Sequence, residues 1–177
     1  PINLEDFPSS ILPALQPQFP GLTVRRAFRY SEPQGTALLK AAQKEAAVAV
    51  AASEAEQPDL LSDGTPAVAL ALADGRAAEF SGPVFAKHRK ALEALLAADK
   101  PAKTGHDLKE VARLLRGAGL PFGGAAGDTY LAAYCLDPGP RPDLHDLLVA
   151  RGASLDENAP LAVRAAAVPS LLAALEA

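Results

Sequence analysis

The residues that could do chemistry in this chain stand in no strong catalytic or metal-binding pattern. The three histidines, His88, His106 and His145, lack a second ligand four residues on, and no HExxH motif occurs. The glycines of residues 117–124 follow neither the phosphate-binding loop nor the dinucleotide-binding fingerprint, which both need fixed spacings. We therefore expect structural histidines and glycine-containing turns rather than a metal or nucleotide site.

The thiol and the basic clusters have equally simple interpretations. Cys135 lies in an apolar helical stretch with no basic neighbour that would activate it, so we expect a buried, inert thiol. A single cysteine also excludes an internal disulfide and a cysteine-rich zinc site. The basic clusters at residues 25–29 and 87–90 are typical of solvated surface, and a weak phosphate contact is the alternative.

Several carboxylates are candidates for acid chemistry. Asp128 stands where a strand ends and a helix begins, so it is either a catalytic carboxylate or a helix N-cap, and we favour the cap. Asp143 and Asp146 flank His145 on a short polar segment, which predicts surface positions.

Composition limits the partners. The chain has 177 residues, a net charge of −4 and only 5% aromatic residues, which argues against strong autonomous binding to phosphate backbones or stacking on bases. No apolar stretch approaches the ~20 residues of a membrane span, and no basic-then-apolar leader is present. We expect a cytoplasmic protein that binds no membrane. Pro1 is either a native start after Met removal or a boundary within a longer protein.

The first elements follow from prolines and alternation. Five prolines within residues 1–35 favour an extended lead-in, with a strand possible within residues 22–30. A helix is expected over 36–46, followed by a central, fully buried strand over 47–52. Alternation around Asp74-Gly75 predicts a β-hairpin over 67–80 with a type I′ turn.

Helical periodicity then dominates. A helix over 83–97 carries one apolar face, formed by Val84, His88, Leu92, Leu95 and Leu96. Further elements are expected as strands over 101–105 and 120–126, and as helices over 107–117, 128–136, 144–150 and 159–176. Asp107 and Glu110 fit a capping box at the start of the helix over 107–117. Pro169 should kink the last helix or make it restart. This order predicts an α/β domain over 36–177, with a mixed sheet flanked by helices.

Three stretches of sequence resemble a known family. These are Gly105-His106-Asp107-Leu108-Lys109, then residues 127–138 (GDTYLAAYCLDP), then residues 143–147 (DLHDL). In this order they resemble the 3′–5′ exonuclease domain of bacterial family A DNA polymerase I, over about residues 45–177. The resemblance implies an RNase H-like fold, which agrees with the order of elements expected above.

The same resemblance implies a lost active site. Active members hold two divalent metals with four carboxylates, and a tyrosine orients the attacking water. The positions that match these acids and this tyrosine carry Ala51, Ser53, Val111, Ala165 and Pro169. A shift of register by one residue in the first motif recovers only Glu54.

The resulting hypothesis is an inactive, exonuclease-like domain that supports the polymerase of a bacterial DNA polymerase I in replication and repair. Its partner would be the polymerase domain of the same protein, with DNA contacted through that protein and weakly or not at all by this domain alone. No cofactor is expected here, and Mg²⁺ would act only in the polymerase domain.

Two alternatives stay open. One is an active two-metal 3′–5′ exonuclease of the same fold, with its acids drawn from Glu54, Asp59, Asp63, Asp107 and Asp128. The other is a free-standing α/β interaction module.

Overall fold

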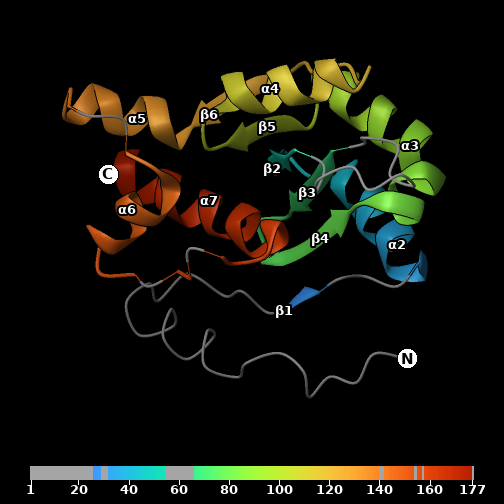
Figure 1. The fold of residues 1–177 in the computed structure, drawn as a ribbon, viewed down its shortest axis with the longest axis horizontal. Helices are drawn as coiled ribbons and strands as arrows, with labels where there is room; N and C mark the ends of the chain where they lie inside the picture. The colour runs from blue at the N-terminus through green and yellow to red at the C-terminus, as the bar shows by residue number, and fades with distance from the viewer. Residues whose placement is uncertain are drawn as a thin grey trace.

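In the part of the chain that the structure describes, six strands form one mixed sheet. The computed structural model describes residues 26–28, 32–54, 66–139, 142–153, 155–156 and 158–176. The strands lie in the order β1-β4-β3-β2-β5-β6 (Figure 1). Their bounds are β1 Arg26–Phe28, β2 Ala47–Ser53, β3 Ala67–Ala71, β4 Arg76–Phe80, β5 Ala102–Gly105 and β6 Ala125–Asp128.

Six helices complete the described part of the chain. Their bounds are α2 Glu32–Ala42, α3 Gly82–Ala97, α4 Leu108–Gly117, α5 Thr129–Leu136, α6 Leu144–Val149 and α7 Leu161–Glu176. The predicted α/β fold, with a mixed sheet flanked by helices, is confirmed. None of the helices in the described ranges is long and apolar enough to cross a membrane.

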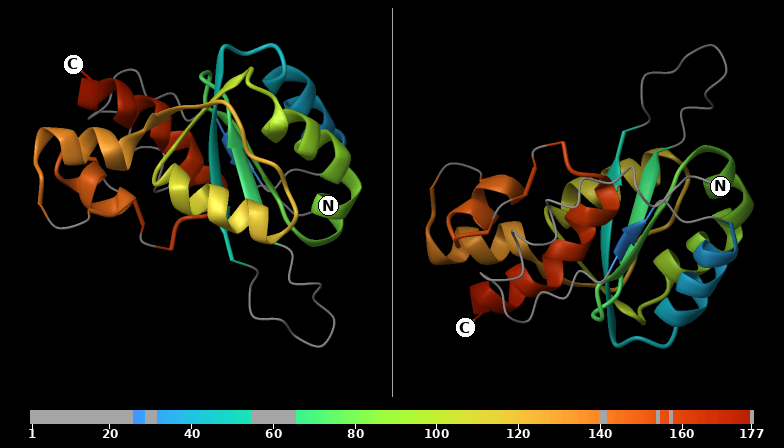
Figure 2. Two further views of the ribbon diagram at one scale, coloured as in Figure 1. Left: turned by 90° about the horizontal axis from the view of Figure 1, so that it is seen from above. Right: turned by 90° about the horizontal axis from the view of Figure 1, so that it is seen from below.

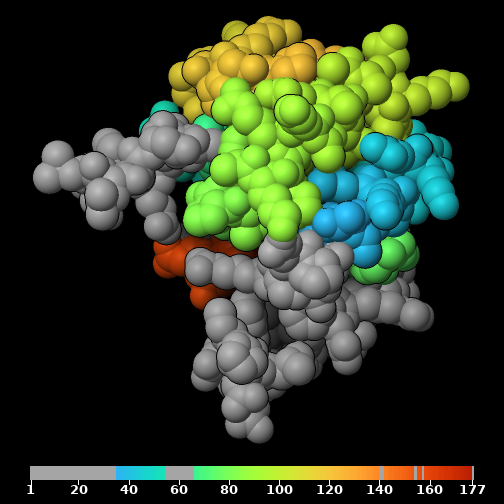
Figure 3. All heavy atoms as spheres, turned by 90° about the vertical axis from the view of Figure 1, so that its right-hand side faces the viewer, coloured from blue at the N-terminus to red at the C-terminus, as the bar shows by residue number. Residues whose placement is uncertain are grey.

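The helices lie in two layers, one on each side of the sheet. Helices α5, α6 and α7 form one buried cluster with alanines of the strands. Helices α2, α3 and α4 form a second cluster with the larger apolar side chains of the same strands. Figure 2 shows α7 and α2 on opposite sides of the strands, and Figure 3 shows α2 and α3 side by side. Both layers follow from alternation, since successive strand residues point to opposite faces.

The central position of β2 is confirmed, but its complete burial is not. β2 lies between β3 and β5 in the sheet, and Val48, Ala49 and Val50 are buried. The residues from Ala51 to Ser53 are only half-buried. The cause is the pairing: β5 is in register with residues 47–49 of β2, so the last residues of β2 pair with β3 alone.

The hairpin is confirmed, with a different turn. β3 and β4 pair antiparallel around Asp74-Gly75. Only Gly75 has a positive φ (85°), whereas a type I′ turn would need one at Asp74 as well. The Gly75 amide donates to the carbonyl of Leu72, and Asp74 Oδ1 accepts from the amide of Arg76. The loop is therefore a type I turn followed by a left-handed glycine, a common three-residue hairpin loop.

Several element boundaries differ from those expected. Helix α2 begins at Glu32 and ends at Ala42, with turns up to residue 46, instead of spanning 36–46. Strand β6 begins only at Ala125, and Leu120 is buried in an irregular segment. Helix α7 is continuous through Pro169, so the expected restart is wrong.

The expected lead-in contains two elements of the fold. β1 pairs parallel with β4, and the first turn of α2 precedes residue 36. Residues 1–25 lie outside the described residues, so the division of the chain at residue 35 stays a prediction. In α3 the buried face matches the predicted one, except that Phe85 is buried and Val84 is only half-buried.

Candidate functional site

The five positions expected to have lost their acids and tyrosine lie on three elements. Ala51 and Ser53 are on the second half of β2, and Val111 is on the second turn of α4. Ala165 and Pro169 are one turn apart on α7. The fold thus places these positions on β2 and on two helices that both pack against β2.

The two faces of the sheet separate these positions. Ala165 is fully buried among the small residues beneath α7, and Ala51 packs against the same cluster. Val111 is 5% exposed and belongs to the cluster of large side chains on the other face. Val111 therefore does not share a cluster with Ala51 and Ala165, and the space around it is occupied by apolar groups.

The acids that an active nuclease would use form ion pairs or hydrogen bonds within the chain. Glu54 is exposed and lies 3.5 Å from Arg113 as an ion pair. Asp107 caps α4, with its Oδ1 accepting from the amide of Glu110 at 3.3 Å. Asp59 and Asp63 lie outside the described residues.

Asp128 accepts three hydrogen bonds from backbone amides. Its Oδ1 accepts from the amide of Tyr130 at 2.9 Å, which caps α5 as predicted. The same oxygen accepts from the amide of Asp107 at 2.9 Å, and Oδ2 accepts from the amide of Leu108 at 2.7 Å. One carboxylate thus joins the N-termini of α4 and α5, where the helix dipoles favour negative charge.

This arrangement corrects the expected capping box. In a capping box Glu110 would bond the amide of Asp107, but here Asp128 takes that amide. Glu110 pairs instead with Arg113 at 2.6 Å. The hydrogen bond from the guanidinium lowers the pKa of Glu110, and the carboxylate raises the pKa of Arg113. Asp107 also adopts a left-handed conformation (φ 53°), which asparagine and aspartate tolerate best among non-glycine residues.

The three histidines have structural roles in the described part of the chain. His88 is 7% exposed and stands edge-on to the ring of Phe80, and its Nε2 has no hydrogen-bond partner there. His106 Nδ1 lies 3.0 Å from Thr129 Oγ1. His145 Nδ1 lies 2.7 Å from the carbonyl oxygen of Leu155. His88 therefore lies in the core, His106 and His145 are half-buried, and the expectation that none of them binds a metal stays a prediction.

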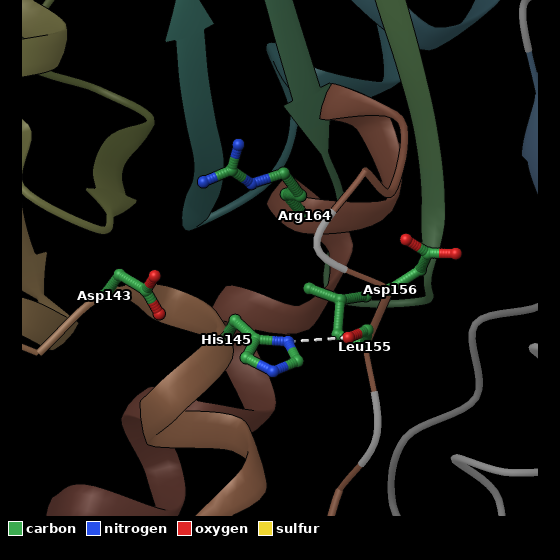
Figure 4. Close-up of a pocket in the computed structure, with 5 residues that line it drawn as sticks. All are labelled: Asp143, His145, Leu155, Asp156 and Arg164. Carbon is green, nitrogen blue, oxygen red and sulfur yellow. Dashed lines mark hydrogen bonds between the residues drawn. The ribbon is translucent and has the colours of Figure 1, made fainter.

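One open pocket lies beside the start of α7. It has a volume of about 270 Å³ and is lined by Asp143, His145, Leu155, Asp156 and Arg164 (Figure 4). Asp143 and Asp156 use an oxygen each on nearby amides, of Asp146 and Asn158. None of the five expected site positions lines this pocket. Its two acids outnumber the one arginine, Arg164, so the pocket has no excess positive charge to attract a phosphate.

Cys135 is placed differently from what the sequence suggested, whereas the sequence patterns led to no prediction for Lys103. Cys135 is exposed, which corrects the expectation of a buried thiol. Lys103 on β5 is fully buried, and its Nζ donates to the carbonyl of Ala98, the C-cap of α3. Burial lowers the pKa of Lys103, while the nearby Asp99 acts in the opposite direction. A lone lysine in a four-residue strand gives no sequence signal of burial.

Metal-binding groups are not apparent in the described ranges. Between residues 26 and 176, leaving out the gaps, no three histidine, cysteine or acidic side chains are placed to share a metal ion.

Comparison with known proteins identifies the fold. No family model matches the sequence, and no curated protein does. Among solved structures, the POL domain of Pol1 from M. smegmatis, in complex with DNA primer-template and dNTP, is similar with a TM-score of 0.62. The identity is 32% over 79% of this chain. This chain spans 25% of the length of that protein chain.

A second structure supports the fold alone. Trypanosoma brucei RNase D, in complex with RNA U12, has a TM-score of 0.64 at 13% identity, over 90% of this chain and 65% of that chain. The chain therefore has the RNase H-like fold of 3′–5′ exonuclease domains, and its sequence is similar to one part of the M. smegmatis Pol1.

Proposed function

We propose that this chain is a catalytically inactive, exonuclease-like domain of a bacterial DNA polymerase I, which supports the polymerase domain in replication and repair in the cytoplasm. The observation that carries the proposal is the 32% identity with one part of Pol1, together with the residues at the expected site positions. DNA would be contacted through the whole protein, and synthesis with Mg²⁺ and dNTPs would take place in the polymerase domain.

The chemistry of the side chains supports the loss of activity. Two divalent cations a few ångströms apart need several anionic oxygens to bind them. Ala51, Val111, Ala165 and Pro169 offer none, and Ser53 offers only a hydroxyl. Val111 and Ala165 are also buried, so water and a metal ion would have to displace packed apolar groups there. These residues do not fit the metal pair of the active enzymes.

The alternative of an active nuclease lacks comparable support. Asp128 accepts three backbone amides, and Asp107 caps the helix that carries Val111. Moving either carboxylate onto a metal would leave helix N-termini without their caps, each worth about 1 kcal/mol.

The direct test is a nuclease assay on the unmodified chain. A single-stranded DNA labelled at its 5′ end is incubated with millimolar Mn²⁺ or Mg²⁺, with and without EDTA. We expect no shortening from the 3′ end. Shortening of the DNA that EDTA abolishes would overturn the proposal that the domain is catalytically inactive. The protein that contains this chain should extend a primer on a template, and the lack of a polymerase domain in it would overturn the proposed partnership.

A further inference from the structure

Helix α5 presents an apolar surface that this chain does not cover. Within the described ranges, the large apolar side chains that are exposed are Leu131 at 56%, Tyr134 at 47%, Leu136 at 63% and Val149 at 52%. Three of the four belong to α5, and Val149 belongs to the neighbouring α6. Apolar exposure is therefore concentrated on one part of the molecule, which marks a contact surface more often than isolated exposed residues do.

The spacing on α5 makes this a true helix face. Leu131, Tyr134 and Cys135 are three and four residues apart and share the side opposite the buried Thr129 and Ala133. The ring of Tyr134 stacks on that of Tyr130, with 6.5 Å between the centroids. A tyrosine held in place in this way can bury its ring in a partner with little loss of conformational freedom, as at many interface hot spots.

The short length of α5 also favours a partner. It has eight residues and buries only two of them against the rest of the described chain. Isolated helices shorter than about 12 residues are marginal in water, so such a helix gains stability when its open face is covered. The helix contains no charged residue, which disfavours a DNA backbone as the partner.

The end of the described chain lies near helix α5. Helix α7 packs along α5 and ends at Glu176, and the C-terminal label stands on this side of the molecule in Figures 1 and 2. Any domain joined after residue 177 would therefore begin next to α5. This chain spans only 25% of the Pol1 chain that it resembles, so that protein has a large further part.

We propose that the exposed face of α5, formed by Leu131, Tyr134 and Cys135, docks against the polymerase domain of the same protein. This inference rests on the proposed function. It adds the location of the contact, and it can fail while that function stands.

The thiol of Cys135 provides the test, because it is the only cysteine of the chain and lies within the face. The rate of maleimide labelling at Cys135 is measured by peptide mass mapping, in the 177-residue chain and in the parent protein. We expect labelling to be about tenfold slower or more in the parent, since the core of an interface is desolvated. An Ala94→Cys variant serves as the matched control, because Ala94 is exposed on α3, on the other side of the sheet. Its labelling rate should be the same in both proteins.

A second variant separates docking from misfolding. Leu131→Asp adds a charge to an exposed position, so the 177-residue chain should keep its circular dichroism and its Cys135 labelling rate. In the parent protein the same change should restore fast labelling of Cys135.

Other results would overturn the proposal. Equal labelling of Cys135 in chain and parent, with primer extension intact, would leave the proposed function standing and exclude α5 as the contact. Protection of Cys135 in the 177-residue chain that increases with its concentration, with a dimer in sedimentation, would assign the face to a second copy instead.

Discussion

On one face of the sheet the strands meet α7 through alanines, and on the other face they meet α2, α3 and α4 mainly through valine, leucine and phenylalanine. Strand β3 shows how one sequence specifies both: Ala69 and Ala71 point to α7, whereas Val68 and Leu70 point to the other helices. Side-chain size, and not apolar character alone, thus differs between the two layers. The small residues allow α7 to lie close to the strands, and the large ones fill the wider space beneath α3 and α4.

The largest difference between the faces should appear when side chains are truncated. Phe80 is fully buried on the face of large residues. The substitution Phe80→Ala should lower the unfolding free energy of the protein by about 3–5 kcal/mol. The matched truncation on the alanine face, Ala71→Gly, should lose only about 1 kcal/mol. Urea unfolding followed by circular dichroism measures both. Equal losses would show that the two layers do not differ in packing as described.

A charge placed on the face of large residues should have the next largest effect. Val111→Asp restores one acid at an expected metal position, and we expect a loss of about 3 kcal/mol because the carboxylate has no buried partner. The variant should still show no metal-dependent nuclease activity. Lys109→Asp, exposed on the same helix, is the control and should change stability by less than about 0.5 kcal/mol. A stable Val111→Asp domain that cleaves DNA would contradict both the packing and the proposed inactivity.

For a change that adds volume, the alanine face should be the more sensitive of the two. Ala69→Leu places three extra carbons between β3 and α7, and should lower the unfolding free energy by about 1–3 kcal/mol. Leu70→Met, the neighbouring residue on the other face, conserves volume and should lose less than about 1.5 kcal/mol. Thermal unfolding of the two variants gives the comparison, and a neutral Ala69→Leu would show that α7 has room to move away.

The smallest effect concerns the buried Lys103, whose Nζ donates to the C-cap of α3 on the face of large residues. Burial lowers the pKa of Lys103, so between that lowered pKa and the ordinary 10.5 the unfolded chain binds more protons than the folded one. The unfolding free energy should therefore rise with pH through this window, and the rise should be absent in Lys103→Met. Urea unfolding at a series of alkaline pH values tests this, and identical profiles for the two proteins would exclude a lowered pKa.

Local patterns in the sequence predicted most of the elements, because alternation and capping act over a few residues. The strand at Ala47–Ser53, the hairpin around Gly75 and the cap at Asp128 are of this kind. The bonds from Asp128 to the start of α4 were missed, since they join residues 20 and 21 apart in the chain. The exposure of Cys135 was missed because the sequence of an apolar helix does not show whether that helix packs against its own chain or against another part of a protein.

The positions of the candidate site could not be predicted from local sequence patterns. Ala51, Val111 and Ala165 are ordinary core residues by type, so no pattern in the sequence marks them. They were identified through the resemblance to exonuclease domains, and the structure adds their placement on β2, α4 and α7. The buried Lys103 could not be found, because the acceptor at Ala98 becomes its neighbour only when α3 and β5 are folded.

The alanines beneath α7 also have an entropic consequence. An alanine has no side-chain rotamers to lose on folding, whereas burying a leucine removes about 0.5–1 kcal/mol of rotational freedom. The contact of α7 with the strands, through Ala162, Ala165 and Ala166, therefore forms with little side-chain ordering. Since its stability depends on close approach of backbones, a small displacement of α7 should weaken many contacts at once. We expect α7 to behave as a single rigid body, held in place or released as a unit.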